Sequence, residues 1–301
     1  MGVHNQWDTE ALERAVNSVL AQTCGDFEFI IWNDGSDAGA LELLNKLPSM
    51  DPRIRLAGCD ENRGLAFSLN ECIKMARGRY IARMDADDES LPDRFEKQVG
   101  FLESNKEYSW CGSAAELFDE DGTWGYRQMP EIPEKRDYYK YSPFIHPSVM
   151  FRGEIFNEEN GYLESEETLR CEDYEMFMNL SDKGLKGYNL QDALFRYRET
   201  KKSYHKRTIR YRVCEARIRY QGFKKMGMLF PLGWLYVIRP IAACAVPPSL
   251  IGLVKRTEGR MAKEIRENAY TPDHELRRTF EQIPEYCEQG SVIQGKLKSI
   301  S

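Results

Sequence analysis

The chain has 301 residues, of which 42% are hydrophobic, and this length suits one catalytic domain with an appended segment. Its net charge of -6 argues against general nucleic-acid binding, because nucleic-acid-binding proteins present a basic surface to the phosphate backbone. The eight cysteines include no C-x-x-C pair, so they indicate neither a zinc site nor a dense disulfide framework. The N-terminal residues lack the basic-then-apolar pattern of a signal peptide, and we therefore expect a cytoplasmic protein.

Predicted helices and strands alternate through the N-terminal part of the chain. Apolar spacing predicts helices over 9–20 and 65–76, and apolar runs predict strands over 27–32, 54–57 and 80–84. This alternation predicts a doubly wound α/β sheet. Ligands of such sheets gather outside the carboxyl ends of the strands, where Asp34 and Asp85 stand. We therefore expect these two acidic turns to converge. Farther along, we predict helices over 94–104 and 172–180 and extended runs over 108–118 and 143–151, the second with a break at His146 and Pro147.

The C-terminal extension, residues 201–301, differs in composition from the rest. Residues 201–225 hold ten Lys or Arg against one Glu, and residues 229–254 are apolar but interrupted by four prolines. The prolines disfavour a straight transmembrane helix, whereas a basic segment beside an apolar, aromatic-bearing one is typical of proteins on anionic membranes. We predict a helical extension attached peripherally to the inner face of the plasma membrane. A solvated basic helix is the alternative.

Asp85 and Asp87 form a D-x-D motif directly after a predicted strand. In an extended segment their carboxylates point to the same side, and hard divalent cations prefer such oxygen ligands. An isolated D-x-D is more often a solvated acidic turn that caps the next helix, with Asp88 or Ser90 as the cap. The motif gains weight from the segments around it.

Six segments, taken in order, resemble those of the family 2 glycosyltransferases. They are NSVLAQT (17–23), FEFII (27–31), NDGS (33–36), NRG (62–64), ARGRYIARMDADD (76–88) and PDR (92–94). The resemblance covers residues 2–198. It implies a GT-A fold with a doubly wound mixed sheet over residues 1–200, with a nucleotide-sugar half over 1–95 and an acceptor half over 96–200. It also implies inverting transfer of a sugar from a nucleotide-diphosphate sugar, first of all a UDP-sugar, with Mn2+ or Mg2+ as cofactor.

The resemblance implies roles for individual residues on the donor side. It places the nucleotide against His4, Asn5, Asp34, Arg63 and Asp85, and the metal on Asp85 and Asp87. Two positions depart from the family pattern. Asn33 stands where the family usually has the first Asp of a pair, and His4 stands where it commonly has a Tyr that stacks on the base. The segment before His4 is also shorter than in the family, so we expect a clipped first strand whose neighbours lose backbone partners.

On the acceptor side, the family's Glu-Asp motif implies that Asp173 is the general base. Donor or acceptor contacts are implied for Asp88, His146, Glu172 and Arg198, and His205 falls near the diphosphate. Each has an ordinary alternative: Asp173 as an acidic residue at a helix N-terminus, and His146 as a buried structural histidine. We expect the acceptor to be a glycan or a lipid-linked glycan, since the basic and apolar extension suggests a membrane-surface substrate.

Two other functions remain open at this stage. A sugar nucleotidyltransferase shares the fold, but it usually has a Gly-rich basic loop after the first strand, and residues 5–8 provide none. A catalytically silent sugar- or membrane-binding protein could also retain this scaffold. The clipped first strand and His4 favour that reading, while Asp85, Asp87 and Asp173 oppose it.

Overall fold

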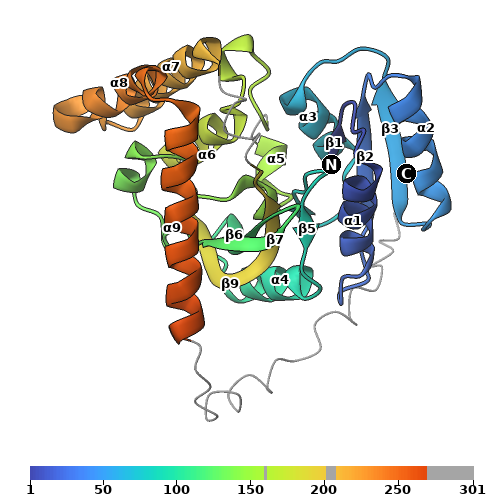
Figure 1. Ribbon diagram of the computed structural model, residues 1–301. Helices are drawn as coiled ribbons and strands as arrows, with labels where there is room; N and C mark the ends of the chain where they lie inside the picture. The colour runs from blue at the N-terminus through green and yellow to red at the C-terminus, as the bar shows by residue number, and fades with distance from the viewer. Residues whose placement is uncertain (159–160, 201–207, 270–301) are drawn as a thin grey trace, which may run out of the picture.

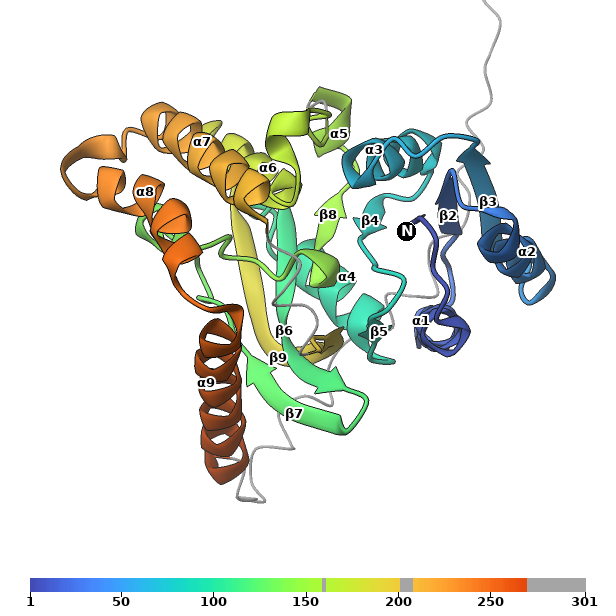
Figure 2. The same ribbon diagram turned by 45° about the horizontal axis from the view of Figure 1, so that its top comes forward.

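The computed structural model describes residues 1–158, 161–200 and 208–269 (Figure 1). The N-terminal elements form one side of the molecule and the C-terminal helices form the other, with the larger sheet between them (Figures 1 and 2). His205 and the polar C-terminal tail lie outside the described residues.

A parallel three-stranded sheet forms the N-terminal side. Its strands are β1 (Gly2–Val3), β2 (Phe29–Asp34) and β3 (Ile54–Cys59), and the helices beside them are α1 (Thr9–Leu20), α2 (Ala38–Lys46) and α3 (Leu65–Met75). The side chain of Asp8 caps α1 by accepting a hydrogen bond from the amide of Ala11. The apolar face of α1 packs with β2, whose residues are all buried.

A mixed sheet forms the middle of the molecule. Its strands run in the order β4 (Tyr80–Ala82), β8 (Met150–Arg152), β6 (Trp110–Asp119), β9 (Gly187–Arg198) and β5 (Glu89–Ser90), with β7 (Gly122–Arg127) paired to β6. The helices of this part are α4 (Arg94–Ser104), α5 (Ile155–Glu158) and α6 (Glu172–Asp182). Single 3-10 turns cover Leu47–Ser49, Lys135–Tyr139, His146–Ser148, Glu166–Thr168 and Ala243–Ala245. Only β6 and β9 pair in parallel here, so the sheet matches the mixed type expected.

The two sheets are separate because β1 has two residues. Among the described residues β1 is hydrogen-bonded to β2, and β4 is hydrogen-bonded to β8 alone. Met1 nevertheless lies beside β4, where it shares a small hollow with Ile81 and Met84. The expected short first strand is therefore present, and the side of β4 that faces it has no strand partner in the described chain.

Three further helices complete the fold: α7 (Ile209–Lys225), α8 (Trp234–Ala242) and α9 (Pro248–Ala269), with a π turn at Leu229–Gly233. Helix α7 packs against α6 and α8, and α9 packs against β7. The α9 contact is close because Gly125 faces Gly259: a Cβ on Gly125 would lie 3.1 Å from the Gly259 carbonyl carbon. No single helix of the described chain is long and apolar enough to span a membrane, although the bent pair Leu229–Ala245 and Ser249–Glu267 passes that test jointly.

Most predicted elements appear with small shifts in their bounds. The helices predicted over 9–20 and 94–104 have those bounds, and the strand predicted over 27–32 begins at Phe29. The break predicted at His146 and Pro147 is confirmed as a 3-10 turn at His146–Ser148, and the strand that follows it begins at Met150. Pro147 cannot donate a ladder hydrogen bond, and the amide and hydroxyl of Ser148 both donate to the carbonyl of Ile145.

Candidate functional site

The centre of the site is the acidic turn that follows β4. Asp85, Asp87 and Asp88 each contribute one carboxylate oxygen to a cluster in which these atoms lie within 4.8 Å of one another. The sequence analysis placed the metal on Asp85 and Asp87, and the structure adds Asp88 as a third neighbour. Three carboxylates at this separation repel one another unless a cation lies among them.

A buried arginine holds the acidic turn in shape. Arg94, at the start of α4, donates to the carbonyl oxygen of Arg83 at 2.9 Å and to the hydroxyl of Ser90 at 2.8 Å, so it grips both ends of the turn. Burial lowers the pKa of Arg94 to about 9. On the other side, the Gln6 side chain donates to the carbonyl of Ala86 at 3.3 Å. The turn is therefore fixed before any ligand binds.

Asp88 is the buried member of the cluster. Its Oδ1 accepts a hydrogen bond of 2.7 Å from the amide of Arg198, while no described residue donates to its Oδ2. Burial raises the pKa of Asp88 well above the ordinary value, and the nearby carboxylates of Asp85 and Asp87 raise it further. A divalent cation would supply the missing partner, since hard cations bind carboxylate oxygens. The residues present therefore fit a Mn2+ or Mg2+ ion.

Asp85 joins the cluster to a second buried arginine. Its Oδ2 lies 2.5 Å from Nη1 of Arg83, whose side chain is only 5% exposed, whereas that of Asp85 is 30% exposed. The ion pair uses one oxygen of Asp85, and the side chain also contributes an oxygen to the acidic cluster. This arrangement agrees with the dual nucleotide and metal role predicted for Asp85, which stays a prediction.

The residues predicted to bind the nucleotide meet at the ends of β1 and β2. Both carboxylate oxygens of Asp34 accept backbone hydrogen bonds, from Arg63 at 2.9 Å and from Gly64 at 2.8 Å. His4 Nδ1 lies 2.7 Å from the carbonyl oxygen of Asp34, and Asn5 Oδ1 accepts from the amide of Asp37. Asp34 thus organises the loop that carries Arg63. Direct contact of these side chains with a nucleotide remains a prediction.

Asp173 and Glu172 occupy the first turn of α6, as predicted for the acidic start of a helix. Burial raises the pKa of Glu172, and the neighbouring Asp173 raises it further, although hydrogen bonds from backbone amides oppose this. One of those amides belongs to Arg170, which adopts a left-handed conformation with φ 65° and donates to Glu172 at 3.0 Å. Glu172 is therefore tied to the turn before α6, and Asp173 is partly exposed beside it.

Tyr162 is a buried residue beside the site that the sequence did not indicate. Its hydroxyl shares a hydrogen bond of 2.6 Å with Nε2 of His146, and both side chains are buried. Burial raises the pKa of Tyr162; the carboxylates of Asp173 and Asp85 raise it further, while Arg83 lowers it. The charges of the predicted base and of the predicted metal ligand therefore both act on this hydroxyl.

A side-chain amide holds Tyr162 in place. Asn70 of α3 donates to the carbonyl of Tyr162 at 2.9 Å and accepts from its amide at 2.8 Å. The preceding Gly161 has φ 72°, and a Cβ there would lie 2.5 Å from Oδ1 of Asn70. This contact spans 92 positions of sequence, so no local motif indicates it. His146 is accordingly a buried, hydrogen-bonded histidine, and burial lowers its pKa well below the usual value, with Arg83 adding to the shift.

Arg198 lies at the end of β9 beside the acidic turn. Its guanidinium contacts Asp8 at 2.8 Å and Glu120 at 3.3 Å, and its own amide binds Asp88. Burial opposes the charge of Arg198, but its hydrogen bond to Asp8 and the charges of Asp8, Asp87 and Glu120 together raise its pKa. Arg198 is thus a cation at the edge of the cluster, as predicted, and its contact with a donor diphosphate stays a prediction.

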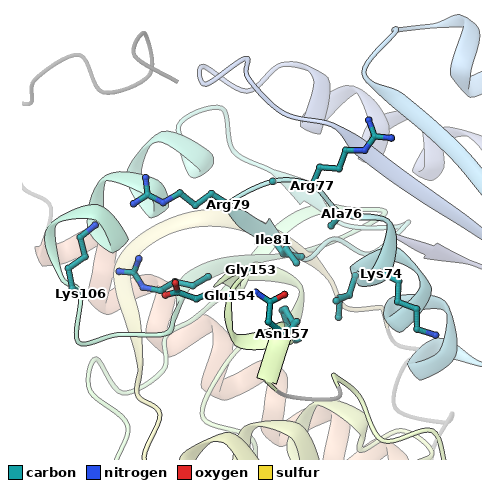
Figure 3. Close-up of a pocket in the computed structure, with 13 residues that line it drawn as sticks. Lys74, Ala76, Arg77, Arg79, Ile81, Lys106, Gly153, Glu154 and Asn157 are labelled. Atoms are coloured by element: carbon teal, nitrogen blue, oxygen red, sulfur yellow. The ribbon is translucent and has the colours of Figure 1, made fainter. Parts of the chain in front are cut away.

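A hollow lies away from these residues, at the opposite end of β4. It has a volume of about 690 Å³ and is lined by Lys74, Arg77, Arg79, Lys106 and Glu154, among others (Figure 3). Most of its cations already have partners: Glu103 pairs with Arg79 and Lys106 at 2.7 and 2.6 Å. Because the hollow contains none of the clustered aspartates, it is separate from the candidate site.

Comparisons with known proteins agree on the family. The model of glycosyl transferase family 2 matches residues 1–158. The chain is 34% identical to EpsE of Bacillus subtilis over 253 residues, 83% of this chain and 90% of EpsE. It is 28% identical to the O-antigen biosynthesis glycosyltransferase WbnJ of Escherichia coli, over 78% of this chain and 92% of WbnJ.

Two solved structures share the fold at low sequence identity. The S. aureus TarS fragment 1-349 in complex with UDP-GlcNAc superposes with a TM-score of 0.58 at 14% identity, covering 89% of this chain and 90% of that one. The mannosyltransferase PcManGT of Pyrobaculum calidifontis, in complex with GDP-Man and Mn2+, gives 0.57 at 15% identity, covering 90% and 79%. The chain therefore has a GT-A fold with a helical C-terminal region, and it belongs to glycosyl transferase family 2.

Proposed function

We propose that this chain transfers a sugar from a nucleotide-diphosphate sugar, preferably a UDP-sugar, to a hydroxyl of a glycan or lipid-linked glycan, with inversion at the anomeric carbon. The observation that carries the proposal is the cluster of Asp85, Asp87 and Asp88, in which a buried carboxylate oxygen of Asp88 has no donor among the described residues. A nucleoside diphosphate with a divalent cation satisfies that cluster. The UDP-GlcNAc and GDP-Man complexes of the two similar folds support this choice of donor.

On the donor side, the three aspartates would hold Mn2+ or Mg2+. The ion would act as a Lewis acid that stabilises charge on the departing diphosphate. The protein contributes a turn fixed by Arg94 and a cation, Arg198, at the edge of the cluster. The loop at Arg63, shaped by Asp34, would flank the nucleoside. These groups bind and orient the donor, which lowers the entropic cost of reaching the transition state.

On the acceptor side, Asp173 would act as the general base. The acceptor hydroxyl oxygen forms a bond to the anomeric carbon and gives its proton to the Asp173 carboxylate. The bond between that carbon and the diphosphate oxygen breaks, and its electron pair leaves with the diphosphate. In-line attack on the opposite face gives inversion. Glu172, with its raised pKa, would donate a hydrogen bond when protonated rather than compete as the base.

Tyr162 and His146 would set the position of α6 relative to the acidic turn. Their hydrogen bond joins the loop before α6 to the turn before β8. Because burial keeps His146 neutral, this pair carries no charge that would compete with the cation. We assign both residues a positioning role.

The relatives suggest the class of acceptor. WbnJ is described as an O-antigen biosynthesis glycosyltransferase, and AmsE of Erwinia amylovora, 29% identical over 66% of this chain, as an amylovoran biosynthesis glycosyltransferase. Both names refer to bacterial polysaccharides. We therefore propose that this chain adds a hexosyl unit during polysaccharide assembly.

Release of UDP or GDP from a panel of nucleotide sugars tests the proposal. Full-length protein is incubated with each donor in the presence of Mn2+, Mg2+ or a chelator. Release from at least one donor that requires the cation and is lost in Asp173→Asn supports the proposal. Asp182→Asn, at the exposed far end of the same helix, is the matched control and should retain activity. No release from any donor would instead favour a silent binding protein, and release that persists with chelator would exclude the metal site.

A further inference from the structure

Helix α8 has an apolar outer face that nothing in the described chain covers. Its inner side packs into the core through Val237, together with Phe223 and Met226 of the α7 region. Its outer side presents Leu235 and Ile238, which are 67% and 54% exposed. A surface helix of a soluble domain is normally polar on its outer face, so this helix is apolar on both sides.

The apolar face extends beyond α8 in both directions. Phe230 in the π turn is 75% exposed and packs edge-on to Trp234, whose ring also lies 5.4 Å from that of Tyr220. After α8 the exposed apolar residues continue at the start of α9; they are Val246, Leu250, Leu253 and Val254. Figures 1 and 2 show that α7 and α8 project at the end of the molecule opposite β3. Such a group of exposed apolar residues, here called the patch, marks an interaction site rather than ordinary surface.

The charges around the patch indicate which partner covers it. Between residues 226 and 254 there is no Asp or Glu, and Arg239 is the single charged residue. Across residues 208–260, ten Lys or Arg stand against two Glu, although the whole chain has net charge -6. Exposed Lys224 and Lys225 precede the patch and exposed Lys255 follows it. Exposed cations that flank an apolar and aromatic segment along the chain complement an anionic bilayer surface, whose headgroups attract Lys and Arg while its interface accepts aromatic rings.

Helices α7 and α8 are firmly joined to the rest of the protein. Arg219 of α7 is 2% exposed and donates to the carbonyls of Tyr139 and Lys140 at 2.6 and 2.9 Å. The ring of Tyr139 stacks on Tyr236 of α8 at 4.9 Å between centroids. Helix α7 also packs on α6, which carries Asp173. We infer that the outer face of α8, with the π turn and the start of α9, lies on an anionic lipid bilayer and holds α6 at a fixed height above it.

Vesicle flotation of the full-length chain, without any nucleotide sugar, tests the inference independently of catalysis. Vesicles of phosphatidylcholine alone are compared with vesicles that also contain about 30% phosphatidylglycerol, at about 0.05 M and about 0.5 M NaCl. We expect binding to the anionic vesicles at low salt and weaker binding at high salt. The double variant Leu235→Ser/Ile238→Ser should lower the partition coefficient about 10- to 100-fold, because it removes two inserted side chains.

The matched control is Met50→Ser/Ile132→Ser, which removes two side chains that are 46% and 59% exposed on other parts of the surface. It should bind as the wild type does. Lys224→Gln/Lys225→Gln should weaken binding to anionic vesicles and reduce its salt dependence. The inference is overturned if the wild type stays in solution with both vesicle types, if it binds neutral vesicles equally well, or if the α8 variant floats like the control. Dimerisation that is lost in the α8 variant, without vesicle binding, would assign the face to a second copy of the chain.

Discussion

Replacement of Asp88 by Asn tests whether the acidic turn is strained in the absence of a cation. Asn keeps an oxygen to accept from the amide of Arg198, and it puts an NH2 group where Oδ2 has no donor. That NH2 group can donate to the carboxylates of Asp85 or Asp87, whose oxygens lie within 4.8 Å. Removal of a buried, unpartnered acceptor is worth about 1–3 kcal/mol. At about 2 °C per kcal/mol for a chain of this size, Tm without metal should rise by about 2–6 °C.

The effect of Asp88→Asn should depend on pH. Burial and the two neighbouring carboxylates raise the folded-state pKa of Asp88 above its ordinary value of 3.8, so the folded protein holds a proton that the unfolded chain releases. The contribution of Asp88 to stability therefore falls as pH rises from about the ordinary pKa to the folded-state pKa. The Asp88→Asn variant has no titrating group at this position. Its free energy of unfolding should therefore exceed that of the wild type by a larger amount as the pH rises across that range.

Addition of Mn2+ should reverse the order of the two proteins. A ligand at 100 times its Kd stabilises the folded state by about 2.7 kcal/mol. Mn2+ at that concentration should stabilise the wild type by this amount, and it should stabilise the Asp88→Asn variant much less. Binding should also release a proton in the wild type, measurable by titration calorimetry in two buffers of different ionisation enthalpy. Asp192→Asn, an exposed site outside the cluster, is the control. The reasoning fails if Asp88→Asn is no more stable than the wild type without metal, or if both proteins respond equally to Mn2+.

Three further predictions concern the acceptor side. Asp173→Asn should lower turnover by about a thousandfold or more while donor binding, followed by thermal shift, stays unchanged; near-normal turnover would remove it from the mechanism. Tyr162→Phe removes the hydroxyl that meets the buried histidine, so unfolding free energy should fall by about 1–3 kcal/mol and kcat should drop about tenfold with donor KM preserved. Gly184→Ala should lower the free energy of unfolding by about 1–2 kcal/mol, because alanine rarely adopts the φ of 84° found there. In Gly161→Ala the added Cβ also clashes with the side-chain oxygen of Asn70, so chemical denaturation should show a further loss of about 1–3 kcal/mol. Equal losses in the two variants would show that this contact is unimportant.

The elements around the site could be predicted because their signals are local. Apolar residues at helical spacing predict α1, which buries Leu12 and Val16, and the continuous apolar run predicts β2, which is buried at every position. Placement of the acidic turn then follows from the rule that strand ends carry ligands. The break at Pro147 could likewise be predicted, because a proline has no amide hydrogen to donate to a neighbouring strand.

The residues that shape the site could not be predicted in the same way. Arg94 and Gln98 read as ordinary polar positions of a helix, yet both are fully buried, and Arg94 donates to a carbonyl 11 positions away. Asn70 reads as a helix surface residue, and its partner Tyr162 lies 92 positions later. Hydrogen bonds between residues so far apart in the sequence produce no periodic pattern, so they are seen only in the folded structure.

The charges of the site suggest what a metal ion would add to it. Arg83 forms an ion pair with Asp85, whereas Arg94 donates chiefly to neutral groups and the guanidinium of Arg198 contacts Asp8 and Glu120. Oxygens of Asp85, Asp87 and Asp88 nevertheless lie within 4.8 Å of one another in a turn that Arg94 holds in shape. A cation bound together with a diphosphate would offset the repulsion among these carboxylates. If the turn prefers this combined ligand, as the proposed function requires, metal occupancy should rise and fall as donor is supplied and consumed.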